Sequence, residues 1–464
     1  MIDDFYTRVV STLLFPLHEQ LKRHPTASLL RSLERSQWWS VERLQALQLD
    51  RLRRLMSAVS QQVPYYRDLF RERGLSPEQF RTFADLRRLP LVEKSLIRQQ
   101  GERWRARSAA NLVTQRTSGS SGEPLTFQLG RHRIGMDIAA KWRATRWWGV
   151  DFGDRELVLW GSAIESDRQN RLRSWRDRLF RSRLVPVENL TEARIDQILD
   201  QVKAYRPRVL FGYPSAMARL AWRAKERACH FRELGIRVAF TTSEVLRPEW
   251  RAIIGEVFGC EVSDEYGARD AGLIARQCPA GGLHITAEAL IVEILDDTNR
   301  PVPPGETGHI VITNLVGPEF PFIRYRTGDR GALDPLPCTC GRGLPLLGSL
   351  EGRCNDGLVA LDGSWVHGSS FNYLLRELNG LKAYKIVQED REQVEVLLSV
   401  DGVLPAGFEQ ELRWALRRRL GGGVQVQLRR MDLIPPETGG KFRHVVCRIA
   451  DTTNASPNVA RWHS

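Results

Sequence analysis

The chain has 464 residues, of which 42% are hydrophobic and 27% charged, and its formal net charge is +13. This composition excludes a disordered or fibrous chain, and the length predicts two or more domains. No stretch approaches the roughly 18 uncharged apolar residues of a membrane span. The first residues include Asp3 and Asp4 where a secretory leader would be basic, so we expect a cytoplasmic protein.

The positive charge comes from arginine that is spread along the whole chain, with local concentrations at 171–183 and 413–419. Clustered basic residues are typical of proteins that bind nucleic acid. No basic motif interleaved with aromatic residues stands out here, so we expect no nucleic-acid partner. Solvated arginines are the main interpretation, and attraction to anionic small molecules or to an anionic membrane surface is the alternative.

The first hundred residues predict mainly helices. Leucines recur at helical spacing along 44–59 and along 13–21, where Pro16 would kink or split the helix. The second stretch suits packing on the large domain, with contact to a membrane or a partner as the alternative. The Val-Pro-Tyr-Tyr segment at 63–66 is expected to end the helix before it.

Helical and extended patterns alternate after residue 157. One apolar helical face at 195–202 is followed by an apolar run at 209–211 that suits a buried strand. Another buried strand is expected at 236–241, directly before the polar Thr242-Ser243-Glu244. This alternation predicts an α/β architecture with ligands at the ends of the strands.

Further signals follow from residue 290 onward. Paired strands are expected at 290–295 and 309–315, a helix at 408–420 and a strand at 424–428. We therefore expect a large α/β domain with mixed sheets over residues 1–352 and a small α+β domain over residues 353–464.

The most informative segment is Thr117-Ser118-Gly119-Ser120-Ser121-Gly122-Glu123-Pro124. Glycines let the backbone turn tightly against a ligand, while hydroxyls and exposed amide groups can surround phosphate oxygens without adding bulk. The segment is not a Walker loop, because the Gly-Lys-Ser/Thr ending is missing. Considered by itself, a segment of this composition is a flexible linker about as often as it is a binding loop.

Four further motifs follow it in order: Tyr266-Gly267-Ala268-Arg269-Asp270, Arg324-Tyr325-Arg326-Thr327-Gly328-Asp329, Gly352-Arg353-Cys354-Asn355-Asp356 and Pro435-Pro436-Glu437-Thr438-Gly439-Gly440-Lys441-Phe442-Arg443. With these five segments the chain resembles, over nearly its whole length, the acyl-adenylate-forming superfamily of acyl-CoA ligases and adenylation domains. More narrowly it resembles the phenylacetate-CoA ligase branch, which includes CapK-like proteins associated with capsule and exopolysaccharide gene clusters.

The resemblance implies an ATP-dependent, AMP-forming ligase. Such an enzyme activates a carboxylic acid, aromatic acids included, as an acyl-adenylate and passes the acyl group to a thiol such as coenzyme A. It also implies that the small C-terminal domain moves between an adenylating pose and a thioester-forming pose about a hinge near Arg353. The acid itself, the oligomeric state and the pathway cannot be deduced from the sequence.

The resemblance also assigns roles to residues of each motif. Tyr266, next to Gly267, would stack on adenine, and Asp329 would accept hydrogen bonds from the ribose hydroxyls. Arg353 would reach the ribose or a phosphate. The ATP phosphates would be held by Thr117, Ser118, Gly119, Ser120, Ser121 and Gly122.

Two further assignments concern the reacting carboxylate and the adjoining strand end. Lys441 would approach the carboxylate and the α-phosphate as charge builds up during adenylation, a task that suits a compact charge on a flexible stem. Ser243 and Glu244 stand where the branch has similar residues, and we count them as nucleotide-binding candidates.

Each assigned residue also has an ordinary structural interpretation. Tyr266 could be a half-buried aromatic residue, Asp329 a cap on the turn at Gly328, and Lys441 a solvated charge. The shared order of the motifs favours the functional interpretation.

The chain departs from the superfamily pattern after the Tyr-Gly-X step, where Arg269-Asp270 replaces the usual Thr-Glu. Asp270 can still bind Mg²⁺, which prefers a carboxylate together with phosphate oxygens and water. Arg269 cannot copy the hydroxyl of the usual threonine. We keep both residues as catalytic candidates. The lysine that usually follows the phosphate loop is replaced by Leu125, which is common in the phenylacetate-CoA ligase branch.

A separate set of residues is Cys278, His284, Cys338 and Cys340. Three thiolates and one imidazole complete a tetrahedral site for structural Zn²⁺ and leave no position for catalysis. The resemblance supports zinc, since related proteins carry similar residues near the acyl pocket. Free buried cysteines and a disulfide are the alternatives, although seven cysteines in 464 residues do not look like a secreted disulfide framework.

Two other functions compete with thioester formation. One is adenylation without coenzyme A, in which the acceptor is an amine, a carrier protein or a deazaflavin. The other is a degenerate CapK-like protein of a polysaccharide system, which the Arg269-Asp270 pair suggests and the retention of Asp329 and Lys441 opposes. An apolar pocket wall and an ordinary core are equally compatible with a set of aromatic residues, namely Trp142, Trp147, Trp148, Trp160, Phe211 and Tyr213.

Overall fold

The computed structural model describes residues 2–117, 125–160, 171–187, 190–353, 357–362, 365–367, 375, 381–402, 404–435 and 442–449. Side chains are not described for residues 2, 171–174, 352, 353, 365 and 367. The described residues up to 352 form one compact unit, and those from 353 onward form a second.

Helices dominate the first hundred residues, as the sequence predicts. They are α1 (Ile2–Val9), α2 (Phe15–Leu21), α3 (Thr26–Ser36), α4 (Val41–Gln62), α5 (Pro64–Glu72) and α6 (Lys94–Gln100). The Ser40 hydroxyl caps α4 by accepting from the Arg43 amide at 3.4 Å. Pro64 starts α5, because its fixed φ suits a first helical turn and its missing N–H would be unpaired there anyway.

The helix expected at 13–21 is divided just before Pro16. A π-helical turn, Val10–Leu14, precedes α2, which carries Pro16 in its first turn. Phe15 points into the core, whereas Leu13, Leu17 and Leu21 are 60%, 49% and 77% exposed. The helical spacing of these leucines therefore does not mark a buried face.

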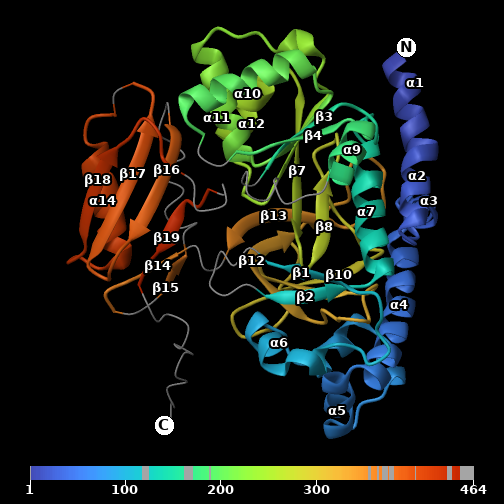
Figure 1. Cartoon of the computed structure of the whole chain (residues 1–464). Coiled ribbons are helices and arrows are strands. Elements are labelled where there is room, and N and C mark those ends of the chain that lie inside the picture. The colour runs from blue at the N-terminus through green and yellow to red at the C-terminus, as the bar shows by residue number, and fades with distance from the viewer. Residues whose placement is uncertain are drawn as a thin grey trace, which may run out of the picture. The chain divides into compact units, whose positions relative to one another are not determined.

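The large unit is built on a sheet of eleven strands among the described residues, in the order β10-β11-β12-β13-β9-β8-β7-β6-β5-β3-β4. Figure 1 labels several of these strands, among them β7 and β8. One half is parallel and consists of β3 (Glu156–Leu159), β4 (Ser182–Val185), β5 (Val209–Gly212), β6 (Val238–Thr242) and β7 (Glu261–Ala268). The other half contains β8 (Gly272–Gln277), β9 (Leu283–Ile285), β10 (Leu290–Leu295), β11 (Gly308–Asn314), β12 (Tyr325–Leu333) and β13 (Leu346–Arg353). The order changes at β7, which pairs parallel with β6 and antiparallel with β8.

Helices connect and cover the parallel strands: α7 (Arg131–Arg146), α9 (Arg171–Leu179), α10 (Glu192–Tyr205), α11 (Pro214–Glu226) and α12 (Pro248–Phe258). Leu159 of β3 pairs with Gly212 of β5, which in turn pairs with Thr241 of β6. The residues that follow β3, β5 and β6 therefore meet at one edge of the sheet. In parallel sheets, this carboxyl edge is where ligands bind.

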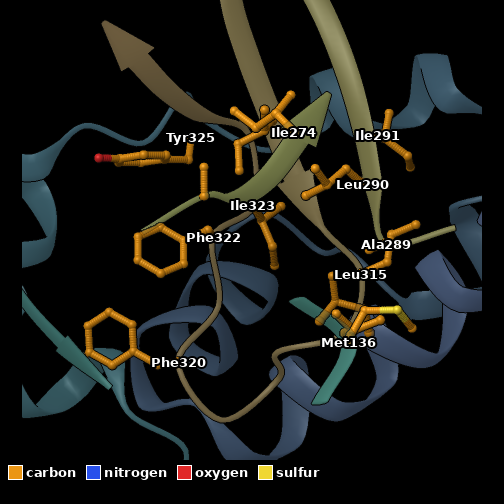
Figure 2. Packing of buried hydrophobic residues seen from close by; sticks show 14 of the residues in the cluster. Met136, Ile274, Ala289, Leu290, Ile291, Leu315, Phe320, Phe322, Ile323 and Tyr325 are labelled. Carbon is orange, nitrogen blue, oxygen red and sulfur yellow. The ribbon is translucent and has the colours of Figure 1, made fainter. Parts of the chain in front are cut away.

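One large hydrophobic core joins the antiparallel strands to the N-terminal helices. Figure 2 shows Phe322 and Tyr325 in this core, together with aliphatic residues of the neighbouring strands. The two rings pack edge to face with their centroids 5.0 Å apart, and the Tyr325 side chain is 1% exposed.

The small unit has a four-stranded sheet, in the order β18-β17-β16-β19, and one described long helix. Its elements are β14 (Gly357–Val359), β15 (Trp365–His367), β16 (Leu381–Gln388), β17 (Gln393–Val400), α14 (Phe408–Leu420), β18 (Gln425–Arg430) and β19 (Val445–Cys447). Leu412, Leu416 and Leu420 of α14 pack in one cluster with Ile386 and Val396 of the sheet. The expected α/β class and the α+β character of the C-terminal part are confirmed, and the mobility of the small unit stays a prediction.

Among the described residues, none of the helices combines the length and the apolarity that a crossing of the bilayer requires. The expected cytoplasmic location stays a prediction.

Asp264 on β7 is a half-buried carboxylate near the middle of the large sheet. Its Oδ1 accepts from the Thr241 hydroxyl at 3.2 Å and from the Glu265 amide at 3.0 Å. Burial raises the pKa of Asp264 from 3.8 to about 6. Because the folded-state pKa is raised, the stability that Asp264 contributes is fully present below the unfolded pKa and is lost as the pH rises through about 6.

We expect Asp264→Asn to keep both accepted hydrogen bonds and to remove this pH dependence. The variant should exceed the parent in free energy of unfolding at neutral pH by as much as about 3 kcal/mol, the equivalent of that pKa change. The advantage should shrink as the pH falls toward about 4. Urea unfolding at several pH values checks this, and parallel pH profiles for the two proteins would contradict it.

Candidate active site

The ends of the Ser/Gly-rich segment are held together by a β-hairpin. Strands β1 (Val113–Arg116) and β2 (Thr126–Leu129) pair antiparallel, with Arg116 opposite Thr126. Directly after this pair, the Thr117 amide donates to the Leu125 carbonyl at 3.0 Å, and the Leu125 amide donates to the Thr117 hydroxyl at 2.9 Å. Thr117 thus closes the base of a short loop. The candidates Ser118, Gly119, Ser120, Ser121 and Gly122 lie outside the described residues.

Tyr266 and Asp329, which come from different motifs, are directly bonded. The Tyr266 hydroxyl donates to Asp329 Oδ2 at 2.7 Å and lies 3.3 Å from the Thr327 hydroxyl. Burial, together with the Asp329 charge, raises the pKa of Tyr266 well above its usual value, so the phenol keeps its proton and remains a donor. The turn before Asp329 uses Gly328 at a φ of +85°, which side chains rarely adopt.

Asp270 is 4% exposed and has several partners. Its Oδ2 accepts from the Tyr325 hydroxyl at 2.5 Å, and its Oδ1 accepts from the Ala271 amide at 3.1 Å. Lys94 Nζ lies 3.9 Å from Oδ2. The guanidinium of Arg133 donates to the Asp270 backbone carbonyl at 3.2 Å. The carboxylate is therefore held by two hydrogen bonds and one ion pair, and Arg133 holds the backbone of the same residue.

Arg269 is exposed and points to the base of the Ser/Gly-rich loop. Its Nη1 donates to the Arg116 carbonyl at 3.2 Å, one residue before Thr117. The arginine that departs from the superfamily pattern thus ties β7 to the hairpin that carries the loop. Gly267 allows β7 and β8 to approach closely, because a Cβ there would lie 2.8 Å from the Gly272 carbonyl oxygen.

Ser243 and Glu244 lie at the carboxyl end of β6. Ser243 has a φ of +72°, an uncommon left-handed conformation for a residue with a side chain. Glu244 Oε2 accepts from the Ser215 amide at 3.1 Å, in the first turn of α11. This sharp turn after the strand fixes the Glu244 carboxylate at the sheet edge.

In the large unit, Tyr266 is thus hydrogen-bonded to Asp329. Arg269 is hydrogen-bonded to Arg116, and Thr117 to Leu125. The side chain of Arg353, at the end of β13, and all of Lys441 lie outside the described residues. Three partners of Asp270 were missed from the sequence, namely Tyr325, Lys94 and Arg133. Only Tyr325 carried a signal, because it stands inside one of the five motifs.

The predicted metal ligands Cys278, His284, Cys338 and Cys340 come together in the large unit. Their ligand atoms all lie within 4.8 Å of one another, and Cys278 and His284 are buried. Cys278 Sγ is 3.6 Å from Cys338 Sγ, and His284 Nε2 is 3.2 Å from Cys340 Sγ. The described cysteines are all free thiols, so the disulfide alternative is not observed among them.

Strand pairing explains how ligands sixty residues apart meet. Cys278 and His284 flank the turn between β8 and β9, while His284 pairs with Leu346 of β13, the strand that follows the Cys338–Cys340 loop. The turn needs Gly282, because a Cβ there would lie 2.6 Å from Cys338 Sγ. Burial lowers the pKa of His284 to about 4, so its ring is neutral at physiological pH.

The aromatic candidates separate into different environments. Trp142 packs against Phe15 in the main core, and the Trp147 ring lies 5.5 Å from that of His284. Trp148 belongs to a smaller cluster with Phe211, against which Trp160 packs. Trp160 also stacks on Tyr213 with ring centroids 4.5 Å apart, at the carboxyl edge of the parallel strands. The core interpretation therefore applies to Trp142, whereas Trp160 and Tyr213 lie at the sheet edge where a pocket wall would be expected.

Comparisons with known proteins agree with this geometry. Residues 179–315 match the family of AMP-binding enzymes, and residues 358–448 match the CapK C-terminal domain. A phenylacetate-coenzyme A ligase of Thermus thermophilus is 27% identical over 437 residues, which cover 87% of this chain and 96% of the relative. The protein CapK of Staphylococcus aureus is 20% identical, with coverage of 87% and 89%.

A solved structure of 2-hydroxyisobutyryl-CoA ligase, in the postadenylation state with an acyl-adenylate, superposes with a TM-score of 0.71. The identity is 20%, and the match covers 90% of this chain and 92% of that one. At this identity the likeness establishes the shared fold.

We expect Tyr325→Phe to destabilise the protein by about 1.5–3 kcal/mol, because it removes a hydrogen bond to a buried charged group. Tyr66→Phe is a matched control. Both tyrosines are 1% exposed, but the Tyr66 hydroxyl has no hydrogen-bond partner, so its removal should be neutral or stabilising. Urea unfolding of both variants makes the comparison. Equal effects would show that the Tyr325–Asp270 bond contributes nothing to stability.

Proposed function

We propose that this chain, with its AMP-binding segment and its CapK C-terminal domain, is an ATP-dependent, AMP-forming acid–CoA ligase of the phenylacetate-CoA ligase type. It activates a carboxylic acid as an acyl-adenylate and transfers the acyl group to coenzyme A. The observation that carries the proposal is the Tyr266–Asp329 bond, which joins two of the expected nucleotide-binding motifs at a single site.

The residues of the site suit the nucleotide in their chemistry. Asp329 would accept from the ribose hydroxyls, since a carboxylate has lone pairs for several donors and Tyr266 orients this one. The adenine-stacking role of Tyr266 stays a prediction. Thr117, with the loop that follows it, would hold the phosphates through hydroxyl and amide donors, and Arg269 would keep the base of that loop in position.

Asp270 is the residue that would hold Mg²⁺, and its donor set fits only in part. A bound Mg²⁺ would neutralise phosphate charge while the α-phosphate is attacked. The Asp270 carboxyl group contacts the Tyr325 hydroxyl and the Lys94 ammonium through Oδ2. Both of these donors are at Oδ2, and the Ala271 amide donates to Oδ1, so a metal would share the carboxylate with these donors or replace one of them.

The test of the function is release of pyrophosphate that depends on an added carboxylic acid. We expect the parent protein to release pyrophosphate with a panel of aryl and alkyl acids and to form a thioester only when coenzyme A is present. Acid-dependent pyrophosphate without thioester would point to an amine or carrier acceptor instead. No pyrophosphate with any acid would contradict the ligase and favour a degenerate CapK-like protein.

Lys441→Ala separates the two half-reactions. The charge of Lys441 would serve only the attack of the carboxylate on the α-phosphate, so the variant should lose most acyl-adenylate formation, with kcat and kcat/KM falling together. When acyl-adenylate is supplied, the variant should still form the thioester. Normal adenylation with failed thiol transfer would overturn the role assigned to Lys441.

We also propose that Cys278, His284, Cys338 and Cys340 hold a structural Zn²⁺. A tetrahedral site with Zn–S bonds of about 2.3 Å has sulfur–sulfur edges of about 3.8 Å, and the Cys278–Cys338 separation is 3.6 Å. The His284 Nδ1 atom lies 3.3 Å from the Leu344 carbonyl, which suits an N–H donor and directs Nε2 to the metal. With four protein ligands the ion would stabilise the fold and take no part in catalysis.

Purified protein should therefore contain about one zinc per chain. Cys338→Ser combined with Cys340→Ser should lose the metal and lower the melting temperature, because metal binding is coupled to folding. Cys229→Ser is the control, since Cys229 contacts Lys203 and does not belong to the cluster. Elemental analysis with thermal unfolding gives both readouts. Fully folded, metal-free parent protein would exclude the zinc.

A further inference from the structure

An aromatic wall stands at the carboxyl edge of the parallel strands. The Trp160 ring, directly after β3, stacks on the Tyr213 ring at 4.5 Å and on the Phe211 ring at 6.0 Å. Phe211 belongs to β5, and Tyr213 follows the end of that strand as the residue that precedes α11. This wall is continuous with the site, because the next strand, β6, leads into Ser243 and Glu244.

Helix α7 lies on the same face as the wall. Lys141 Nζ of α7 is 3.7 Å from the centre of the Phe211 ring. Arg133, two turns earlier on the same helix, donates to the Asp270 carbonyl. The eight residues from Arg133 to Lys141 span about 12 Å of α-helix, so one helix carries the Asp270 contact and, farther along, a lysine over the aromatic wall.

Lys141 differs from Arg276, another cation on this face, in having no carboxylate partner among the described residues. Arg276 of β8 is 0% exposed, but it is paired with Glu265 at 3.4 Å and donates to the Thr145 hydroxyl. Lys141 is half-buried and has no carboxylate within ion-pair distance in the part of the chain that the structure describes. An aromatic face stabilises a cation, but the N–H donors of the ammonium still require another group to accept their hydrogen bonds.

We propose that the acid activated by this protein carries a second negative charge, remote from the reacting carboxylate, and that Lys141 binds it. The apolar or aromatic body of the acid would lie along the half-buried Trp160, which the buried Tyr213 supports from behind, and its distal carboxylate or other anionic group would meet the Lys141 ammonium. The proposal rests on the ligase function proposed above, and it names the substrate class as acids with an apolar middle and two anionic ends.

The direct test is calorimetric binding of three acids that share one body: 3-phenylpropanoate with a para-methyl, a para-carboxylate or a para-aminomethyl group. We expect the parent protein to bind the para-carboxylate acid about tenfold or more tightly than the para-methyl acid, as a charge-assisted contact allows. Lys141→Met should abolish this preference, and Lys141→Glu should transfer it to the para-aminomethyl acid.

Lys203→Met is the matched control, because Lys203 Nζ also lies over a phenylalanine ring, that of Phe231, but on α10. This variant should keep the preference of the parent. A parent protein that does not discriminate among the three acids would overturn the proposal. So would a Lys141→Met variant that keeps the preference, or one whose only defect is weaker binding of ATP or coenzyme A.

The proposed ligase function and the proposed role of Lys141 would be contradicted by different measurements. Binding of the acids requires no turnover, so calorimetry reports on Lys141 even if no pyrophosphate is released. Conversely, acid-dependent pyrophosphate release with equal kcat/KM for the para-methyl and para-carboxylate acids would support the ligase and overturn the role of Lys141.

Discussion

The hydrogen bond from Tyr266 to Asp329 spans strands that are not neighbours in the sheet. Tyr266 is on β7 and Asp329 on β12, and the strand order places β8, β9 and β13 between them. This half of the sheet must therefore curve until β12 faces β7. The bond from Tyr325 to Asp270, which joins β12 to the turn after β7, depends on the same curvature.

The three intervening strands are also those that the cysteine–histidine cluster connects. Cys278 and His284 lie at the β8–β9 turn, and the Cys338–Cys340 loop leads into β13. A zinc ion there, as proposed, would fix the same strands whose curvature forms the site. Its loss would then reduce activity through the geometry of β12 and not through any direct contact with the reacting groups.

Buried charge in the large unit is mostly paired. Arg143 and Glu288 are 2.6 Å apart, with both side chains almost fully buried, and Arg324 pairs with Glu293 at 3.1 Å. Such pairs contribute little net stability, since desolvation offsets their attraction, but breaking one leaves a costly unpaired charge. Against this background, a half-buried Lys141 without a carboxylate partner among the described residues is the feature that calls for an external anion.

The sequence by itself determined several local elements and predicted the residues of the candidate site. The expected strand at 290–295 and the expected helix at 408–420 have the bounds of β10 and α14, and α4 ends just before Val63-Pro64, because periodicity and proline act over a few neighbouring residues. Tertiary structure alone decided which distant groups meet. Lys94 and Arg133 reach Asp270 from more than a hundred residues away, and the regularly spaced Leu13, Leu17 and Leu21 remain exposed. Helical spacing shows that residues share a face, but only the packing of the whole chain fixes what that face contacts.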